Sequence, residues 1–192
     1  MLRQEIAVAS RFLQAFCSQL TRQCATTPPV ANPQTDDTDL NATRIYIDAD
    51  ACPVKDETYK VAERYKLMTF VVSNSFIQIP KSPLIQRMIV DAGPDIADDW
   101  IAEQVVGGDV VITNDIPLAG RVLAKSAHAI APNGRAFTPD SIGAALAQRA
   151  IMEHIRSTGE ITGGPPPFSN ANRSQFLQAL DQVITREQRT RR

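Results

Sequence analysis

From Arg44 onward, short apolar runs alternate with helical stretches, and this alternation constrains the fold more than any other feature of the sequence. The runs "RIYID" and "LMTFVVS" are rich in the β-branched and aromatic residues that favour strands. Strands that alternate with helices are typical of a parallel sheet with right-handed crossovers. The sequence therefore predicts an α/β fold, a three-layer sandwich around a mostly parallel five-stranded sheet. The strands are expected at residues 44–48, 67–73, 86–92, 109–115 and 128–132, with helices at 53–65, 93–106, 117–127, 138–159 and 174–188.

The 43 residues before this region have a different composition. Residues 2–24 have the spacing of an amphipathic helix, and the stretch after them is rich in Thr, Pro, Asn and Asp, which is typical of a flexible linker. We predict an N-terminal extension at 1–43, an α/β domain at 44–187 and a frayed basic tail at 188–192. A cleaved targeting peptide is an alternative for the extension, because its first segment carries three Arg and one acid. A dispensable extension, or an upstream start codon that is not used, is the explanation we favour.

The composition excludes some classes of protein. The 20 basic and 21 acidic side chains give a formal net charge of −1, which argues against a general DNA-coating protein but not against an enzyme that acts on nucleic acid. No apolar run approaches the ~20 residues that a membrane span needs. The sequence has three cysteines, a small and odd number, so a disulfide framework is not expected. We therefore expect a reducing compartment, the cytoplasm.

Acidic residues follow two of the predicted strands. Asp48 ends the first strand and Asp50 lies just beyond it, while Thr113, Asn114 and Asp115 end the fourth. The carboxyl ends of parallel strands meet at one edge of a sheet, where ligands bind at the point at which strand order reverses. We therefore expect these side chains to lie close together.

The helix between these strands begins with three more acids, Asp95, Asp98 and Asp99. If its N-terminus faces the same edge, the carboxylates repel one another strongly in a low-dielectric cleft. A hard cation with oxygen ligands, Mg²⁺ or Mn²⁺, relieves that repulsion. The alternative is helix capping, because Asp is a favoured N-cap residue and each acid lies near a helix start. Capping is the simpler explanation for any one of them, and a shared site is favoured for all of them together.

Cysteine and histidine provide weaker candidates. Cys52 lies at a helix start, where a thiol pKa can be lowered, but a packing role is the favoured alternative. His128 and His154 lack a paired ligand spacing, and we expect neither to be catalytic.

Four separated motifs, "IYIDADACPVK", "GPDIADDWIAE", "VVITNDIPLA" and "GGPPPFSNANRSQF", resemble the YaiI/YqxD family of small uncharacterised bacterial proteins, which is considered PIN-domain-like. The resemblance covers roughly residues 44–184 and implies a PIN-type sheet with carboxylates for one or two Mg²⁺ or Mn²⁺ ions in a nuclease-like pocket. It implies that Asp48 is the acid ending the first strand and Asp115 the acid of a T-x-D motif. Asp95, Asp98 and Asp99 stand where a middle acid is expected, and which of them faces the metal stays open.

These observations suggest a divalent-metal-dependent nuclease, with RNA more favoured than DNA as its partner. Its metal ligands would come from Asp48, Asp95, Asp98, Asp99 and Asp115, and its catalytic acids from Asp48, Asp50, Asp99 and Asp115. Substrate contacts are expected from Ser73, Asn74, Thr113, Asn114, Lys55 and Arg173, with Lys81, Arg87 and Arg121 as further candidates for the phosphate backbone. Phe168 either stacks on a base or pins the last helix to the core, and we favour the second role.

Two alternatives remain. The first is a non-catalytic module that binds RNA or a partner protein. The second is a phosphatase of the haloacid dehalogenase type, since Asp48 and Asp50 form a D-x-D pair. That type inserts a flap before its first helix, and Pro53 follows Asp50 too closely to leave room for one. The sequence does not define an oligomeric state.

Overall fold

The computed structural model describes residues 42–191 except 51, 94 and 158–167. The chain divides into two units between Leu40 and Asn41, and the α/β domain belongs to the second. Nearly all of the predicted N-terminal extension, with its predicted helix and linker, lies outside the described residues. None of the helices in the described part of the chain is long and apolar enough to cross a membrane.

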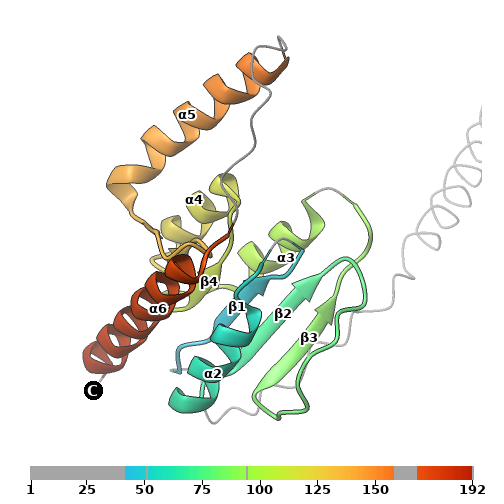
Figure 1. The fold of residues 1–192 in the computed structure, drawn as a ribbon, viewed down its shortest axis with the longest axis vertical. Helices are drawn as coiled ribbons and strands as arrows, with labels where there is room; N and C mark the ends of the chain where they lie inside the picture. The colour runs from blue at the N-terminus through green and yellow to red at the C-terminus, as the bar shows by residue number, and fades with distance from the viewer. Residues whose placement is uncertain (1–41, 51, 94, 158–167, 192) are drawn as a thin grey trace, which may run out of the picture. The chain divides into compact units, whose positions relative to one another are not determined.

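A six-stranded sheet forms the middle layer, with strand order β3-β2-β1-β4-β5-β6 (Figure 1). The first five strands are parallel, which confirms the predicted mostly parallel α/β sheet. The sixth pairs antiparallel with β5 and was not expected, because it is only two residues long. The strands are β1 (Ile45–Asp48), β2 (Thr69–Ser73), β3 (Ile85–Ile89), β4 (Val110–Ile112), β5 (His128–Ile130) and β6 (Ala136–Phe137).

Helices cover both faces of the sheet, as the three-layer prediction requires. One face packs against α2 (Lys55–Tyr65) and α6 (Asn170–Thr190), and the other against α3 (Ile96–Gln104) and α4 (Ile116–Ala124). The remaining described helix, α5 (Pro139–Ser157), packs against α4, and its far end extends beyond the layers (Figure 1).

Alternating side chains on each strand supply the two cores. Ile45 and Ile47 of β1 belong to the core on the α2 and α6 side, whereas Tyr46 belongs to the core on the α3 and α4 side. Because both faces are buried, the strands read as nearly continuous apolar runs. Phe176 and Leu180 bring α6 into the first core, and both are fully buried.

The last helix is longer than the sequence suggested. It begins with a capping box in which Ser169 and Asn172 satisfy each other's backbone N–H groups, and it continues to Thr190. Residues 188–190, expected as part of a frayed tail, are therefore helical. Gly134, with φ of +87°, lets the β5–β6 hairpin approach this helix, since a Cβ there would lie 2.6 Å from the Gln175 backbone.

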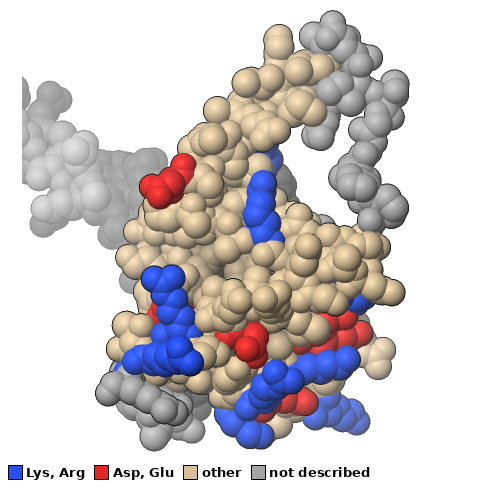
Figure 2. Space-filling view, turned by 60° about the vertical axis from the view of Figure 1, so that its left-hand side comes forward, with Lys and Arg blue, Asp and Glu red and all other residues tan. Residues whose placement is uncertain are grey.

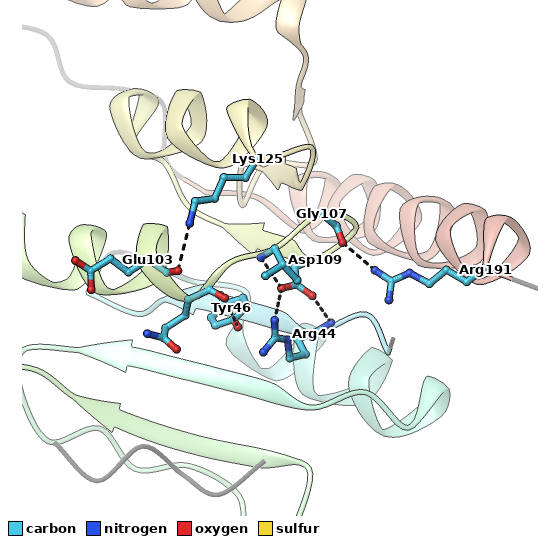
Figure 3. A network of polar contacts seen from close by, with 9 residues as sticks. Arg44, Tyr46, Glu103, Gly107, Asp109, Lys125 and Arg191 are labelled. Atoms are coloured by element: carbon cyan, nitrogen blue, oxygen red, sulfur yellow. Dashed lines mark hydrogen bonds and ion pairs between the residues drawn. The ribbon is translucent and has the colours of Figure 1, made fainter. Parts of the chain in front are cut away.

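A polar network closes the amino-terminal edge of the sheet (Figure 3). The fully buried Asp109 accepts hydrogen bonds from the Arg44 backbone and guanidinium, at 2.9 and 3.1 Å, and from the Val106 backbone N–H at 3.1 Å. Beside it the Tyr46 hydroxyl donates to Gln104 O at 3.4 Å, and burial raises the pKa of this hydroxyl. The buried carboxylate of Asp109 is thus compensated by a cation and by backbone donors.

Candidate functional site

Strand order reverses between β1 and β4. From β1 the chain crosses through α2 to β2 on one side, and from β4 it crosses through α4 to β5 on the other. In open α/β sheets, ligands bind at the carboxyl ends of the two strands that flank such a point. Asp48 is the last residue of β1 and Thr113 directly follows β4, so the predicted acidic motifs lie at this position.

Thr113 links the two strand ends. Its Oγ1 donates a hydrogen bond of 2.9 Å to Asp48 Oδ2 and accepts one of 2.9 Å from the Asp115 backbone N–H. Burial raises the pKa of Asp48, the Thr113 hydrogen bond opposes that increase, and the nearby charges of Asp50 and Asp115 add to it. Asp48 is thus a half-buried carboxylate held in one orientation.

Asp115 has two partners. Its Oδ2 accepts a hydrogen bond of 2.9 Å from the Leu118 backbone N–H, which makes it the N-cap of α4 and confirms the capping role for this residue. Its Oδ1 pairs with Arg149 Nη1 of α5 at 2.5 Å. Both carboxylate oxygens are therefore engaged.

Capping does not explain the acids of α3 in the same way. Asp95 occupies the N-cap position with φ of 61°, and its side chain makes no capping hydrogen bond. Asp99 is exposed and pairs with Arg121 of α4 at 2.7 Å. Asp98 is half-buried, and burial, followed by the charges of Asp48, Asp115 and Asp95, raises its pKa to about 6. Carboxylates from β1, α3 and the start of α4 thus act electrostatically on one another.

These side chains border a cleft of about 350 Å³. It is lined by Asp95, Asp98, Asp99, Asp115, Pro117, Leu118, Arg121 and Arg149. Four of the predicted acids are therefore brought together at one cleft. Asp48 is not among its lining residues, and Asp50 is exposed in the loop beyond β1. In the described part of the chain, no three His, Cys, Asp or Glu side chains are placed to share a metal ion.

Two larger hollows border α6. One, of about 480 Å³, is lined mainly by amide side chains, and the other, of about 460 Å³, lies along the last turns of the helix. Neither contains a cluster of acids or lies at the strand-order reversal. The cleft at α3, α4 and α5 is therefore the better candidate despite its smaller volume.

The predicted substrate-contacting residues other than Arg173 lie around the same edge. Ser73 is buried, and its hydroxyl donates to Ser75 O at 2.7 Å, while Asn74 and Asn114 are exposed. Lys55 Nζ donates to Ala49 O at 3.2 Å and so braces the loop after β1. Thr113 is the member of this predicted group that bonds directly to one of the clustered acids.

Arg173 lies on the α2 and α6 side of the sheet. It pairs with Glu57 at 2.6 Å, donates to Pro53 O at 3.4 Å and lies 5.2 Å from the centre of the Phe168 ring. Phe168 packs against the core, which confirms its role in pinning the last helix. The contacts of Arg173 thus tie α6 to α2.

Cys52 and Arg149 complete the surroundings of the site. Cys52 is buried in the core on the α2 and α6 side, which confirms its packing role, and burial raises the pKa of its thiol to about 11. Arg149 reaches the cleft although no motif of the sequence contains it. A local signal for it is lacking, because its partner Asp115 is 34 residues away and α5 is largely exposed.

The fold and the cleft define a class: a three-layer α/β protein with an acidic cleft at the strand-order reversal of a parallel sheet. Within that class the chain belongs to the YaiI/YqxD family, since the family model described as "Uncharacterized BCR, YaiI/YqxD family" matches residues 46–186. This confirms the resemblance drawn from the four sequence motifs.

Relatives support the assignment. A UPF0178 protein of Caulobacter vibrioides (strain NA1000 / CB15N) is 63% identical over 145 residues, covering 76% of this chain and 95% of the relative. A UPF0178 protein of Caulobacter sp. (strain K31) is 64% identical over 147 residues, covering 77% and 97%. One from Rhodopseudomonas palustris (strain TIE-1) is 59% identical over 149 residues, covering 78% and 94%. No solved structure matches the chain significantly.

Proposed function

We propose that this protein is a divalent-cation-dependent nuclease that hydrolyses phosphodiester bonds, with RNA as the preferred substrate class. One observation carries the proposal: Asp48, Asp98 and Asp115 come from three elements that meet where the strand order reverses, and burial together with the charges of the other two acids raises the pKa of Asp98 to about 6. Side chains that repel one another at a ligand-binding position indicate a positively charged ligand.

The chemistry of the donors fits Mg²⁺ or Mn²⁺. Carboxylate oxygens are the ligands these ions prefer, and Mg²⁺ keeps several waters, so it needs few protein ligands. Asp48, Asp98 and Asp115 would hold the ion, with Asp95 and Asp99 at the rim of the cleft. A bound ion would supply charge stabilisation at the phosphate under attack. Because no three acids are placed to share an ion in the described residues, loading requires side chains to move.

The surrounding residues have roles that do not depend on the ion. Thr113 fixes the orientation of Asp48 through its 2.9 Å hydrogen bond. Asp50, exposed beside it, would accept a proton from the attacking water as the new P–O bond forms, while the leaving oxygen takes a proton from solvent. Asn74 and Asn114, both exposed at this edge, would donate hydrogen bonds to the phosphate.

The phosphatase alternative has less support. The helix α2 begins at Lys55, five positions after Asp50, which leaves no room for the flap that type normally inserts. In addition, the phosphatase would need Ser73 as its second motif, and the hydroxyl of Ser73, the last residue of β2, donates to Ser75 O in the loop that follows. Turnover of a chromogenic phosphate ester, with an acid-labile phosphate trapped on Asp48, would support the phosphatase over the nuclease.

The test compares Mn²⁺ binding and RNA cleavage in the wild type and in the Asp48→Asn, Asp115→Asn double variant. Asn is as good an N-cap as Asp, so α4 keeps its cap, and circular dichroism checks the fold. We expect Mn²⁺ binding and cleavage of a short fluorescent RNA to be lost. The matched control is Asp56→Asn, Asp140→Asn, which removes two exposed acids from first turns of other helices.

Each outcome has a distinct meaning. Unchanged Mn²⁺ affinity in the double variant contradicts the proposal. Mn²⁺-independent RNA binding with no cleavage of RNA or DNA supports the non-catalytic module instead.

A further inference from the structure

Two arginines reach the acidic cleft from different helices. Arg121 of α4 and Arg149 of α5 both line it, together with four aspartates. Arg121 pairs with Asp99 and Arg149 with Asp115, in each case through Nη1. The two arginine side chains remain 46% and 45% exposed. Each is therefore a cation at the rim of the cleft with much of its guanidinium surface open to solvent.

The net charge of the cleft favours the binding of a cation first and of an anion only afterwards. Four aspartates and two arginines line it, so its ionised side chains sum to −2. A phosphodiester, which is itself negative, is repelled by such a cleft, and one divalent cation cancels the excess. After that, the two guanidinium groups become the natural partners of a phosphate, because their planar donors match phosphate oxygens.

Arg149 stands in direct competition with such a cation. The Oδ2 atom of Asp115 caps α4 and the Oδ1 atom holds Arg149, so a cation that approaches Oδ1 competes with the guanidinium for it and repels it. The helix α5, which carries Arg149, can allow the guanidinium to move away from Asp115. It packs mainly against α4, and most of its residues are exposed. A displaced Arg149 would remain tethered beside the cleft.

We propose that Arg149, with Arg121, binds the phosphate of the nucleic-acid substrate once a divalent cation has taken the carboxylates. This rests on the proposed function and extends it to a substrate-binding residue on α5. It has a signature that a merely structural ion pair lacks: removing Arg149 strengthens cation binding and weakens nucleic-acid binding.

The described residues on the face of the molecule in Figure 2 form no broad basic surface, which favours nucleic-acid binding at a few local cations. On it, Lys and Arg side chains are interspersed with Asp and Glu, with broad uncharged areas between them. Nucleic-acid affinity on such a surface has to come from few contacts, so the loss of one arginine has a large effect.

The experiment measures two quantities in the full-length wild type, Arg149→Gln, Arg149→Lys, Arg121→Gln and the control Arg64→Gln. Arg64 also pairs with an aspartate between two helices, Asp181 at 3.5 Å, but lies outside the cleft. Mn²⁺ affinity is measured by electron paramagnetic resonance. Affinity for a short fluorescein-labelled single-stranded RNA is measured by anisotropy with Ca²⁺, and circular dichroism reports the fold.

For Arg149→Gln we expect Mn²⁺ affinity to rise several-fold and RNA affinity to fall about tenfold, with Arg149→Lys between it and the wild type. Arg121→Gln is expected to weaken RNA binding by a similar factor, and Arg64→Gln to change neither quantity. Wild-type RNA affinity in Arg149→Gln, or weaker Mn²⁺ binding, overturns the inference while leaving the proposed nuclease intact. A wild type that binds no Mn²⁺ removes the proposed function and the inference together.

Discussion

The hydroxyl of Thr113 donates to the carboxylate of Asp48 across the two strands between which the order of the sheet reverses. Thr113 is fully buried, and the same oxygen accepts the Asp115 backbone N–H. One side chain therefore positions one acid directly and the other through its backbone. The relative placement of the two acids depends on it.

Replacing Thr113 with Val is expected to lower the free energy of unfolding by about 2 kcal/mol, because Asp48 loses a donor and the Asp115 N–H loses its acceptor. The measurement is urea denaturation at neutral pH. Thr69→Val is the matched control: Thr69 is also a buried threonine of the sheet region, and its hydroxyl has no partner in the described structure. That variant should stay within about 0.5 kcal/mol of the wild type. Equal losses in both would show that the Thr113 bonds contribute little.

Asp98 makes the stability of the protein depend on pH. Burial and the neighbouring acids raise its pKa to about 6, so the folded protein holds this proton more tightly than the unfolded chain does. Its contribution to stability is therefore present below about pH 4 and is lost as the pH rises to about 6.

We accordingly expect Asp98→Asn to stabilise the protein at about pH 7.5 by about 1 kcal/mol, a value reduced for partial exposure and screening. The gain should shrink as the pH falls from about 6 to about 4, because the folded wild type then carries a neutral carboxyl at this position. Thermal unfolding across this range, with exposed Asp140→Asn as control, provides the measurement. A gain that does not vary with pH would contradict the repulsion on which the proposed function depends.

Asp109 at the opposite edge is expected to be a stability residue. Asp109→Asn replaces a carboxylate that accepts three N–H donors by an amide that presents donors of its own, so we expect a loss of about 3 kcal/mol. Chemical denaturation measures it. Arg64→Gln, which breaks an exposed pair, should cost about 0.5 kcal/mol or less. A comparable loss in the two variants would mean that burial adds nothing to the Asp109 network.

The parts of the site that could be predicted from sequence are those set by local pattern. Asp48, Thr113 and Asp115 follow buried strands, and the geometry of parallel sheets brings strand ends together whatever the rest of the chain does. Asp98 was one of three candidates, and its half-buried position on α3 now distinguishes it from the exposed Asp95 and Asp99. The order of strands and helices could also be predicted, because each element follows from a local pattern of apolar residues.

The parts that could not be predicted depend on contacts between distant segments. Arg149 reaches Asp115 from a helix whose sequence shows no functional pattern. Arg173 is paired with Glu57, a contact between residues 116 positions apart that no local pattern indicates, and its expected role at the substrate stays a prediction. The two-residue strand β6 is too short to have a periodic signal.

The helix α6 has a consequence for how the chain acquires its structure during synthesis. It completes the core on one face of the sheet, and its contact between Arg173 and Glu57 joins residues 116 positions apart. Until the ribosome has released α6, that face of the sheet is covered by α2 without α6. Contacts this distant slow folding and leave apolar surface open to aggregation in the meantime. We therefore expect the nascent chain to be protected from aggregation only after α6 has emerged, and not as soon as the sheet has formed.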